Sequence, residues 1–223
     1  MDIKINGFIN FGWSKRTHVA ATTVAVNKNR QLSSTEKELL SQYSQMPDEI
    51  EAEKGYYNNA HFYFPNGKTK SYGKEPEKNN AFVKYQEHYK KAFRSDSKDE
   101  FLRETAYALH FLQDVCMPVH TEEGNFLTKI IGYYLHKNFE RESIYSAESN
   151  LYKLLKNYKK QKVDFITLDS LFLKTADFSA QPKYKVSRFN KSKWESIQQE
   201  CLNYTVSVSK EFVDFMCKYL PKK

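Results

Sequence analysis

Residues Ala108 to His120 read ALHFLQDVCMPVH, and this segment is the most informative part of the sequence. Its apolar residues recur at helical spacing, and His110 and Asp114 are four positions apart, so both side chains project from one face of a helix. Pro118 is expected to end or kink that helix, and His120 follows the break. One rigid element therefore presents an imidazole and a carboxylate side by side.

The four-residue spacing recurs at His136 and Glu140, which form a second histidine–acid pair. Zinc binds imidazole nitrogen and carboxylate oxygen, and a catalytic zinc keeps one position open for a water whose pKa it lowers to about 7. A single histidine beside apolar residues is usually a core residue, and a single histidine–acid pair is often a surface contact. Because several such residues occur together in a chain with 6 histidines, the grouping favours a metal site.

The rest of the chain favours one all-helical domain. Glycine is scarce at 7 residues and proline at 6, and apolar residues recur mostly at helical spacing. A second predicted helix begins at a cap, either Ser33 or Ser34, and is interrupted by Pro47. The other predicted helices span Lys15–Asn27, Ala81–Phe93, Lys98–Val115, Leu127 to about Leu155, and Trp194–Leu220. A long surface loop is predicted over Phe64–Asn79, and Phe165–Ser192 fits either short helices or loops.

Charge, cysteine content and the distribution of apolar residues limit the classes of partner and the kinds of segment that we expect. The net charge of +8 favours an anionic partner, which could be a phosphate-bearing lipid, a nucleic acid or an acidic surface. Cys116, Cys201 and Cys217 form neither an even disulfide framework nor a paired metal motif, so we expect buried or incidental thiols. No apolar run is long enough to span a bilayer, and the start MDIKINGFINFGW lacks the pattern of a signal peptide.

The ordered residues resemble the zinc-dependent phospholipases C, which include bacterial phosphatidylcholine-cleaving enzymes and clostridial alpha-toxin. The resemblance covers roughly Trp13–Glu142 and rests on motifs such as THVAATTVAV, MPDEIE and AHFYFP as well as the two histidine–acid pairs. The matching positions, in order, are Trp13, His18, Asp48, His61, His110, Asp114, His120, His136 and Glu140.

The resemblance implies a single-domain multi-helix bundle with a trinuclear zinc site in a cleft. Residues 13–223 would form this domain, and residues 1–12 would be an N-terminal extension. The implied ligand groups are Asp48, His61, His110 and Asp114 for one zinc, His120, His136 and Glu140 for a second, and Trp13, His18 and a bridging Asp114 for a third. In that family the tryptophan is the first residue and binds through its free amine, so here we expect two to three zinc ions.

The activity implied is hydrolysis of a phosphodiester by metal-activated water, with phospholipid as the substrate and lipid degradation as the outcome. Asp48 is the candidate general base, with a purely structural ligand role as the alternative. The alternatives for the whole chain are a zinc nuclease acting on single-stranded nucleic acid and a non-catalytic lipid-binding or metal-binding module. We expect a monomer that contacts membrane surfaces peripherally, in the cytoplasm, although family members are usually secreted.

Two groups outside this set have simpler interpretations. His88 in KYQEHYKK is expected to be a solvated helix residue and only a remote alternative ligand. Phe62, Tyr63 and Phe64 could line a cleft for lipid or bases, but aromatic runs are more often part of the core.

Overall fold

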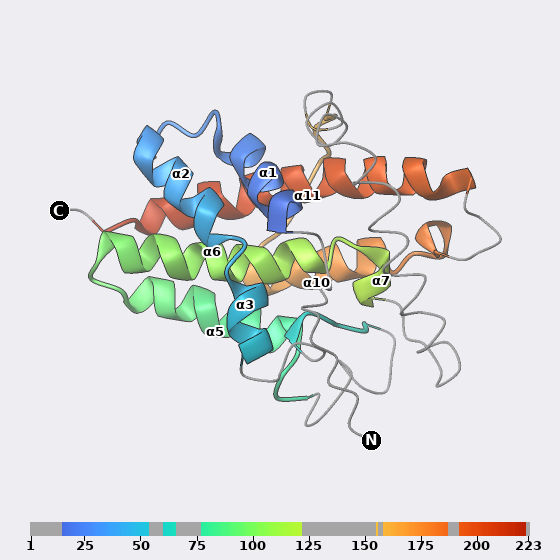
Figure 1. The fold of residues 1–223 in the computed structure, drawn as a ribbon, viewed down its shortest axis with the longest axis horizontal. Coiled ribbons are helices and arrows are strands. Elements are labelled where there is room, and N and C mark those ends of the chain that lie inside the picture. Colours follow the sequence, from blue (N-terminus) through green and yellow to red (C-terminus); the bar gives the residue numbers. More distant parts are fainter. Residues whose placement is uncertain are drawn as a thin grey trace, which may run out of the picture.

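The computed structural model describes residues 15–53, 60–65, 77–121, 155, 158–186 and 192–221. Within these ranges the regular secondary structure is entirely helical (Figure 1), which confirms the predicted all-α fold class. The elements are α1 (Lys15–Val26), α2 (Ser34–Tyr43), α3 (Pro47–Glu53), α5 (Ala81–Arg94), α6 (Lys98–Asp114), α7 (Pro118–Thr121), α10 (Leu168–Ser179) and α11 (Trp194–Met216), with short 3-10 turns at Pro182–Tyr184 and Cys217–Tyr219.

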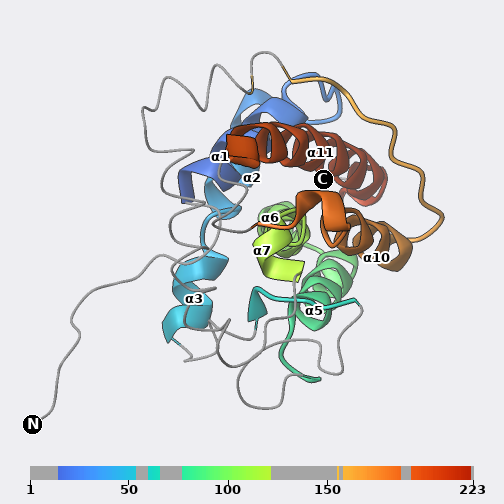
Figure 2. The same ribbon diagram turned by 90° about the vertical axis from the view of Figure 1, so that its right-hand side faces the viewer.

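Helix α6 lies at the centre of the molecule. Figure 2 shows it surrounded by α1, α11, α10, α5 and α3, and the α5–α6 pair forms a helical hairpin joined by a tight connection. From Phe101 to Asp114 every residue of α6 except Arg103 is buried. The helix that carries the central histidine–aspartate pair is therefore the most enclosed element of the bundle.

Side-chain caps explain where the predicted helices begin. At the start of α2, the Ser33 hydroxyl accepts a hydrogen bond from the Glu36 N–H, and the Glu36 carboxylate accepts one from the Ser33 N–H, which together form a capping box. Asn80 caps α5 by accepting from the N–H groups of Phe82 and Val83. The Ser97 hydroxyl caps α6 in the same way.

Both prolines at the predicted breaks lie at the start of the following helix. Helix α2 ends at Tyr43, and Pro47 is the first residue of α3. Helix α6 ends at Asp114, one residue before the predicted end at Val115, and Pro118 is the first residue of α7, so the predicted break is present and the proline itself begins the next helix. Proline is well suited to the first helical position, because its fixed φ matches the helix and the N–H that it lacks would have no intrahelical partner there.

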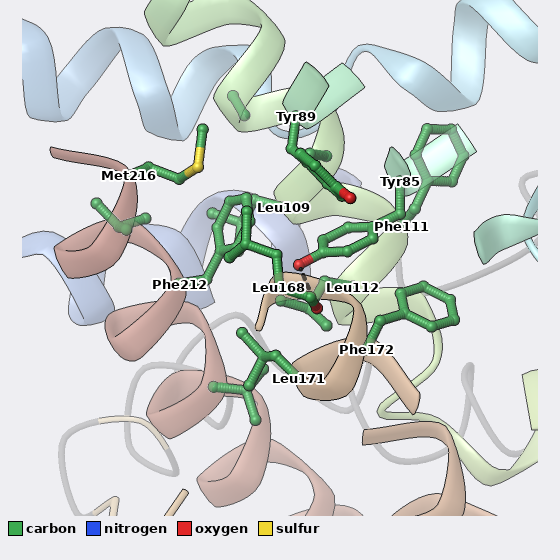
Figure 3. Close-up of a cluster of buried hydrophobic side chains, with 14 of the residues drawn as sticks. Tyr85, Tyr89, Leu109, Phe111, Leu112, Leu168, Leu171, Phe172, Phe212 and Met216 are labelled. Atoms are coloured by element: carbon green, nitrogen blue, oxygen red, sulfur yellow. Dashed lines mark hydrogen bonds between the residues drawn. The ribbon is translucent and has the colours of Figure 1, made fainter. Parts of the chain in front are cut away.

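A hydrophobic core joins α5, α6, α10 and α11. Figure 3 shows Tyr85, Leu109, Phe172 and Phe212 meeting in this core, and all four are fully buried. The Tyr85 hydroxyl donates a hydrogen bond of 3.0 Å to the Leu168 carbonyl, which satisfies the polar end of an otherwise apolar ring. This core holds α6 from the side opposite to α3.

The remaining predictions have mixed outcomes. The three cysteines are free and buried, as expected. The predicted helix from Leu127 lies outside the described residues apart from its end, and so does most of the predicted loop over 64–79. Helix α10 resolves part of the ambiguous stretch after Phe165. None of the described helices combines the length and the apolar character needed to cross a membrane.

Candidate metal centre

Six of the predicted ligands lie in the described residues, and all six are buried. Helix α1 supplies one, α3 one, the segment 60–65 one, α6 two and α7 one. In that order they are His18, Asp48, His61, His110, Asp114 and His120. The other three predicted ligands, Trp13, His136 and Glu140, lie outside the described residues.

One group of candidate ligands consists of Asp48, His61 and His110, each of which offers one ligand atom. Their candidate ligand atoms all lie within 4.8 Å of one another. His110 Nε2 lies 3.2 Å from His61 Nδ1 and 3.6 Å from Asp48 Oδ1, and His61 Nδ1 lies 3.8 Å from the same carboxylate oxygen. Ligand atoms about 2.0–2.1 Å from a tetrahedral zinc ion lie about 3.3–3.4 Å from one another. The spacing of this group therefore suits a zinc ion.

A second group shares His110 and adds His18 and Asp114. His18 Nε2 lies 3.5 Å from Asp114 Oδ1, and the His18 and His110 rings stack with their centroids 4.0 Å apart. The other oxygen of Asp114 lies 2.7 Å from His61 Nδ1 and 3.2 Å from His110 Nε2. Asp114 thus directs one oxygen towards His18 and the other towards His61 and His110.

Hydrogen bonds to carbonyl oxygens orient the histidine rings. His110 Nδ1 donates to the Ser44 carbonyl at 2.8 Å, and His120 Nδ1 donates to the His61 carbonyl at 2.7 Å. Each bond places the proton on Nδ1, so Nε2 keeps the lone pair that a metal needs. The Tyr63 N–H in turn donates to the His120 carbonyl at 3.0 Å, which ties the segment around His61 to α7.

The charge state of Asp114 follows from its neighbours. Burial raises the pKa of this fully enclosed carboxyl, but the adjacent imidazoles of His110, His61 and His18 outweigh burial and hold the pKa well below its usual range. Asp114 is therefore an ionised carboxylate inside the protein, which is the form that binds a cation.

The residues present fit a bound cation. His18 Nε2, Asp114 Oδ1 and Asp48 Oδ1 are buried, and none of them makes a hydrogen bond within the described part of the chain. His18 Nε2 and Asp114 Oδ1 face each other at 3.5 Å. A cation between the groups would satisfy atoms that are otherwise costly to bury. Imidazole nitrogen with carboxylate oxygen is the ligand combination typical of zinc.

His88, which lies outside the predicted ligand set, is packed between two helices. His88 is not a solvated residue: its side chain is 13% exposed, and its Nδ1 lies 2.7 Å from Glu104 Oε2 between α5 and α6. Its ring also stacks on Phe111, with 5.8 Å between the centroids. The expectation of solvation is wrong because His88 lies on the face of α5 that packs against α6.

The aromatic run beside His61 belongs to the core. Phe62, Tyr63 and Phe64 are 7%, 6% and 1% exposed. The Phe62 ring stacks on His120 with 4.8 Å between centroids, and Tyr63 packs edge-on against Phe172. These side chains hold the ligand-bearing segment in place, and the interpretation as core residues is confirmed.

Fold and site together define a helical protein with a buried histidine–aspartate cluster at its centre. No family model matches the sequence, and no curated protein matches it. Nine chains of solved structures do match. One is the alpha toxin from Clostridium absonum, with a TM-score of 0.58 and 13% sequence identity, and the match covers 96% of this chain and 64% of the toxin chain.

The likeness to the alpha toxin is a likeness of fold, and it extends over nearly the whole of this chain. The resemblance inferred from ordered residues is thereby confirmed at the level of the fold. Because the chain spans only 64% of the toxin's length, the toxin contains a further part that has no counterpart in this match.

Proposed function

We propose that this protein is a zinc-dependent phosphodiester hydrolase of phospholipase C type. The observation that carries the proposal is the convergence of Asp48, His61, His110 and Asp114, from three separate segments, within a fold shared with the alpha toxin. The net charge of +8 favours an anionic substrate. Phospholipid is preferred over nucleic acid because of the sequence THVAATTVAV and the glutamate at position 140.

Asp48 is the member of the cluster best placed to meet substrate. It is 8% exposed, whereas His18, His61, His110 and Asp114 are 0–1% exposed. A substrate phosphate would therefore approach from the side of Asp48. The carboxylate has two oxygens, so one can bind zinc while the other accepts a proton from the attacking water. We assign Asp48 as general base on this ground.

The buried residues would hold zinc and keep their own geometry fixed. Bound zinc would supply a low-pKa water and neutralise charge on the phosphate oxygens and the leaving alkoxide. The Ser44 and His61 carbonyls hold the rings of His110 and His120, so these ligands need no reorientation before they bind. Attack by water on phosphorus needs no covalent intermediate with the protein.

The direct test is a pair of turnover assays with one zinc-loaded preparation of the full chain. The substrates are phosphatidylcholine vesicles, with a soluble phosphodiester analogue beside them, and single-stranded DNA. We expect release of a phosphorylated head group at a rate above that of DNA cleavage. DNA cleavage with untouched lipid would replace this proposal by the nuclease alternative, and no turnover of any substrate by fully zinc-loaded protein would favour a non-catalytic module.

A further inference from the structure

We infer that Gln113 is a positioning residue that fixes the tautomer of His18 and so prepares it to bind metal. This inference rests on the proposed zinc site and concerns a residue that the ligand pattern did not single out. Gln113 precedes Asp114 on α6 and is 1% exposed. A buried amide must satisfy an acceptor and two donors inside the protein, and the structure directs its oxygen at His18 and its nitrogen at two hydroxyl groups.

All three hydrogen bonds that Gln113 needs are present. Its Oε1 lies 2.8 Å from His18 Nδ1, and its Nε2 donates to the hydroxyls of Thr22 and Ser209, each at 3.0 Å. The four residues are each at most 1% exposed. Helix α11 contributes no predicted ligand, yet through Ser209 it helps to hold the amide that orients His18 on α1.

The orientation of the amide decides which nitrogen of His18 can bind zinc. With Oε1 facing the ring, Nδ1 must carry the proton and donate, and Nε2 keeps its lone pair. That Nε2 faces Asp114 Oδ1 at 3.5 Å. The reversed amide would place a donor against Nδ1, move the proton to Nε2 and block metal binding at the atom nearest to Asp114.

The same arrangement explains why α6 carries glutamine at this position. Leucine or methionine would fill a similar volume on the buried helix face but offer no acceptor to His18 of comparable strength. An outer partner of this kind on a metal-binding histidine typically contributes about 10–100-fold to metal affinity. Gln113 should therefore act on zinc binding at the His18–Asp114 group without contacting the ion.

The first test is nitrogen NMR of the zinc-free full chain with labelled histidine, with the His18 signals assigned by comparison with His18→Asn. We expect His18 to carry its proton on Nδ1 in the natural protein and to lose this preference in Gln113→Met. A proton on Nε2 in the natural protein would overturn the inference without any variant. This outcome does not depend on zinc or on activity.

The second test is zinc affinity, measured by competition with a chelator. Gln113→Met should weaken zinc binding at the His18–Asp114 group about 10–100-fold, whereas Gln113→Glu keeps an acceptor oxygen towards His18 and should retain it. Ser209→Ala should have a smaller effect. Ser207→Ala is the matched control, because Ser207 is buried on the same helix but bonds to Asn203 and Gln161.

The two proposals fail in different ways. Unchanged zinc affinity in a folded Gln113→Met protein would overturn the role of Gln113 and leave the proposed function standing. Absence of zinc binding in the natural protein would overturn the proposed function, and the NMR experiment would then still decide the orientation of His18.

Discussion

At the scale of single residues, the cluster contains fully enclosed side chains and one, Asp48, that is buried but slightly more exposed. His61, His110 and Asp114 are fully buried, and each is held by a polar neighbour. Asp48 lies at the edge of the cluster and is 8% exposed. The sealed residues are suited to holding a metal, whereas Asp48 is suited to acting on a substrate.

The variant Asp48→Asn tests that division. Asparagine keeps the shape of the side chain but cannot accept the proton, so we expect turnover of a soluble phosphodiester to fall about 100-fold or more. The loss should persist at saturating zinc, whereas a merely structural ligand role would let excess zinc restore the rate. Glu49→Gln, at the exposed neighbouring position, should leave turnover within about twofold of the natural protein.

The ion pair between Glu104 and His88 should make the free energy of unfolding depend on pH in the acidic range. Burial raises the pKa of Glu104, but the hydrogen bond and charge of His88, with Lys91 and Arg103, outweigh burial and lower the pKa below its ordinary value of 4.5. A lowered folded-state pKa contributes stability that is present above the ordinary value and is lost as the pH falls through the folded value.

Glu104→Gln should remove this part of the acid dependence. It replaces a charge-assisted hydrogen bond by a neutral one, which should cost about 1 kcal/mol near neutral pH. Urea unfolding from about pH 6 to about pH 3 would measure it. Glu38→Gln is the control, since Glu38 is exposed and its carboxylate accepts a 3.1 Å hydrogen bond from the neutral amide of Gln42. Equal acid dependence in Glu104→Gln and the natural protein would contradict this account.

At the scale of elements, long helices could be predicted and short ones could not. Helices α5, α6 and α11 span several turns, so their apolar spacing is visible in the sequence. Helix α7 has only 4 residues, which is too few to show a period. Its start at Pro118 could not be predicted, because a proline in the sequence is compatible both with the end of one helix and with the beginning of the next.

The capping box at the start of α2 offers a test at this scale. Ser33→Ala removes the acceptor of the Glu36 N–H and should lower the free energy of unfolding by about 0.5–2 kcal/mol. Ser34→Ala is the matched control, because Ser34 is the first residue inside the helix and does not act as its cap. Equal losses in the two variants would show that the cap assigned to Ser33 contributes nothing specific. Denaturant unfolding of both decides it.

At the scale of the whole molecule, the order of the ligands was predictable but their surroundings were not. The spacing of His110 and Asp114 already places both on one helix face. The carbonyl of Ser44 that orients His110 has no signature in sequence, since every residue has a carbonyl group. Gln113 could have been noticed as a polar residue on a buried face, but its partners on α1 and α11 are set by tertiary packing.

Because the ligands come from α1, α3, α6, α7 and the segment at 60–65, metal should stabilise the entire bundle. A ligand that binds only the folded state at about 100 times its Kd adds about 2.7 kcal/mol per site. Strong chelation should therefore lower the melting temperature, and added zinc should restore it. The effect should fade as the pH falls, because protons compete for the same histidine nitrogens. Identical melting curves with and without chelator would contradict this prediction.

If these buried side chains hold zinc, anomalous diffraction at the zinc absorption edge will locate the ions among them. Crystals of the zinc-loaded full chain should show a peak among Asp48, His61 and His110 and a second beside His18 and Asp114 or beside His120. A folded protein that shows no zinc peak at any of these residues, after loading with excess zinc, would rule out the proposed zinc site.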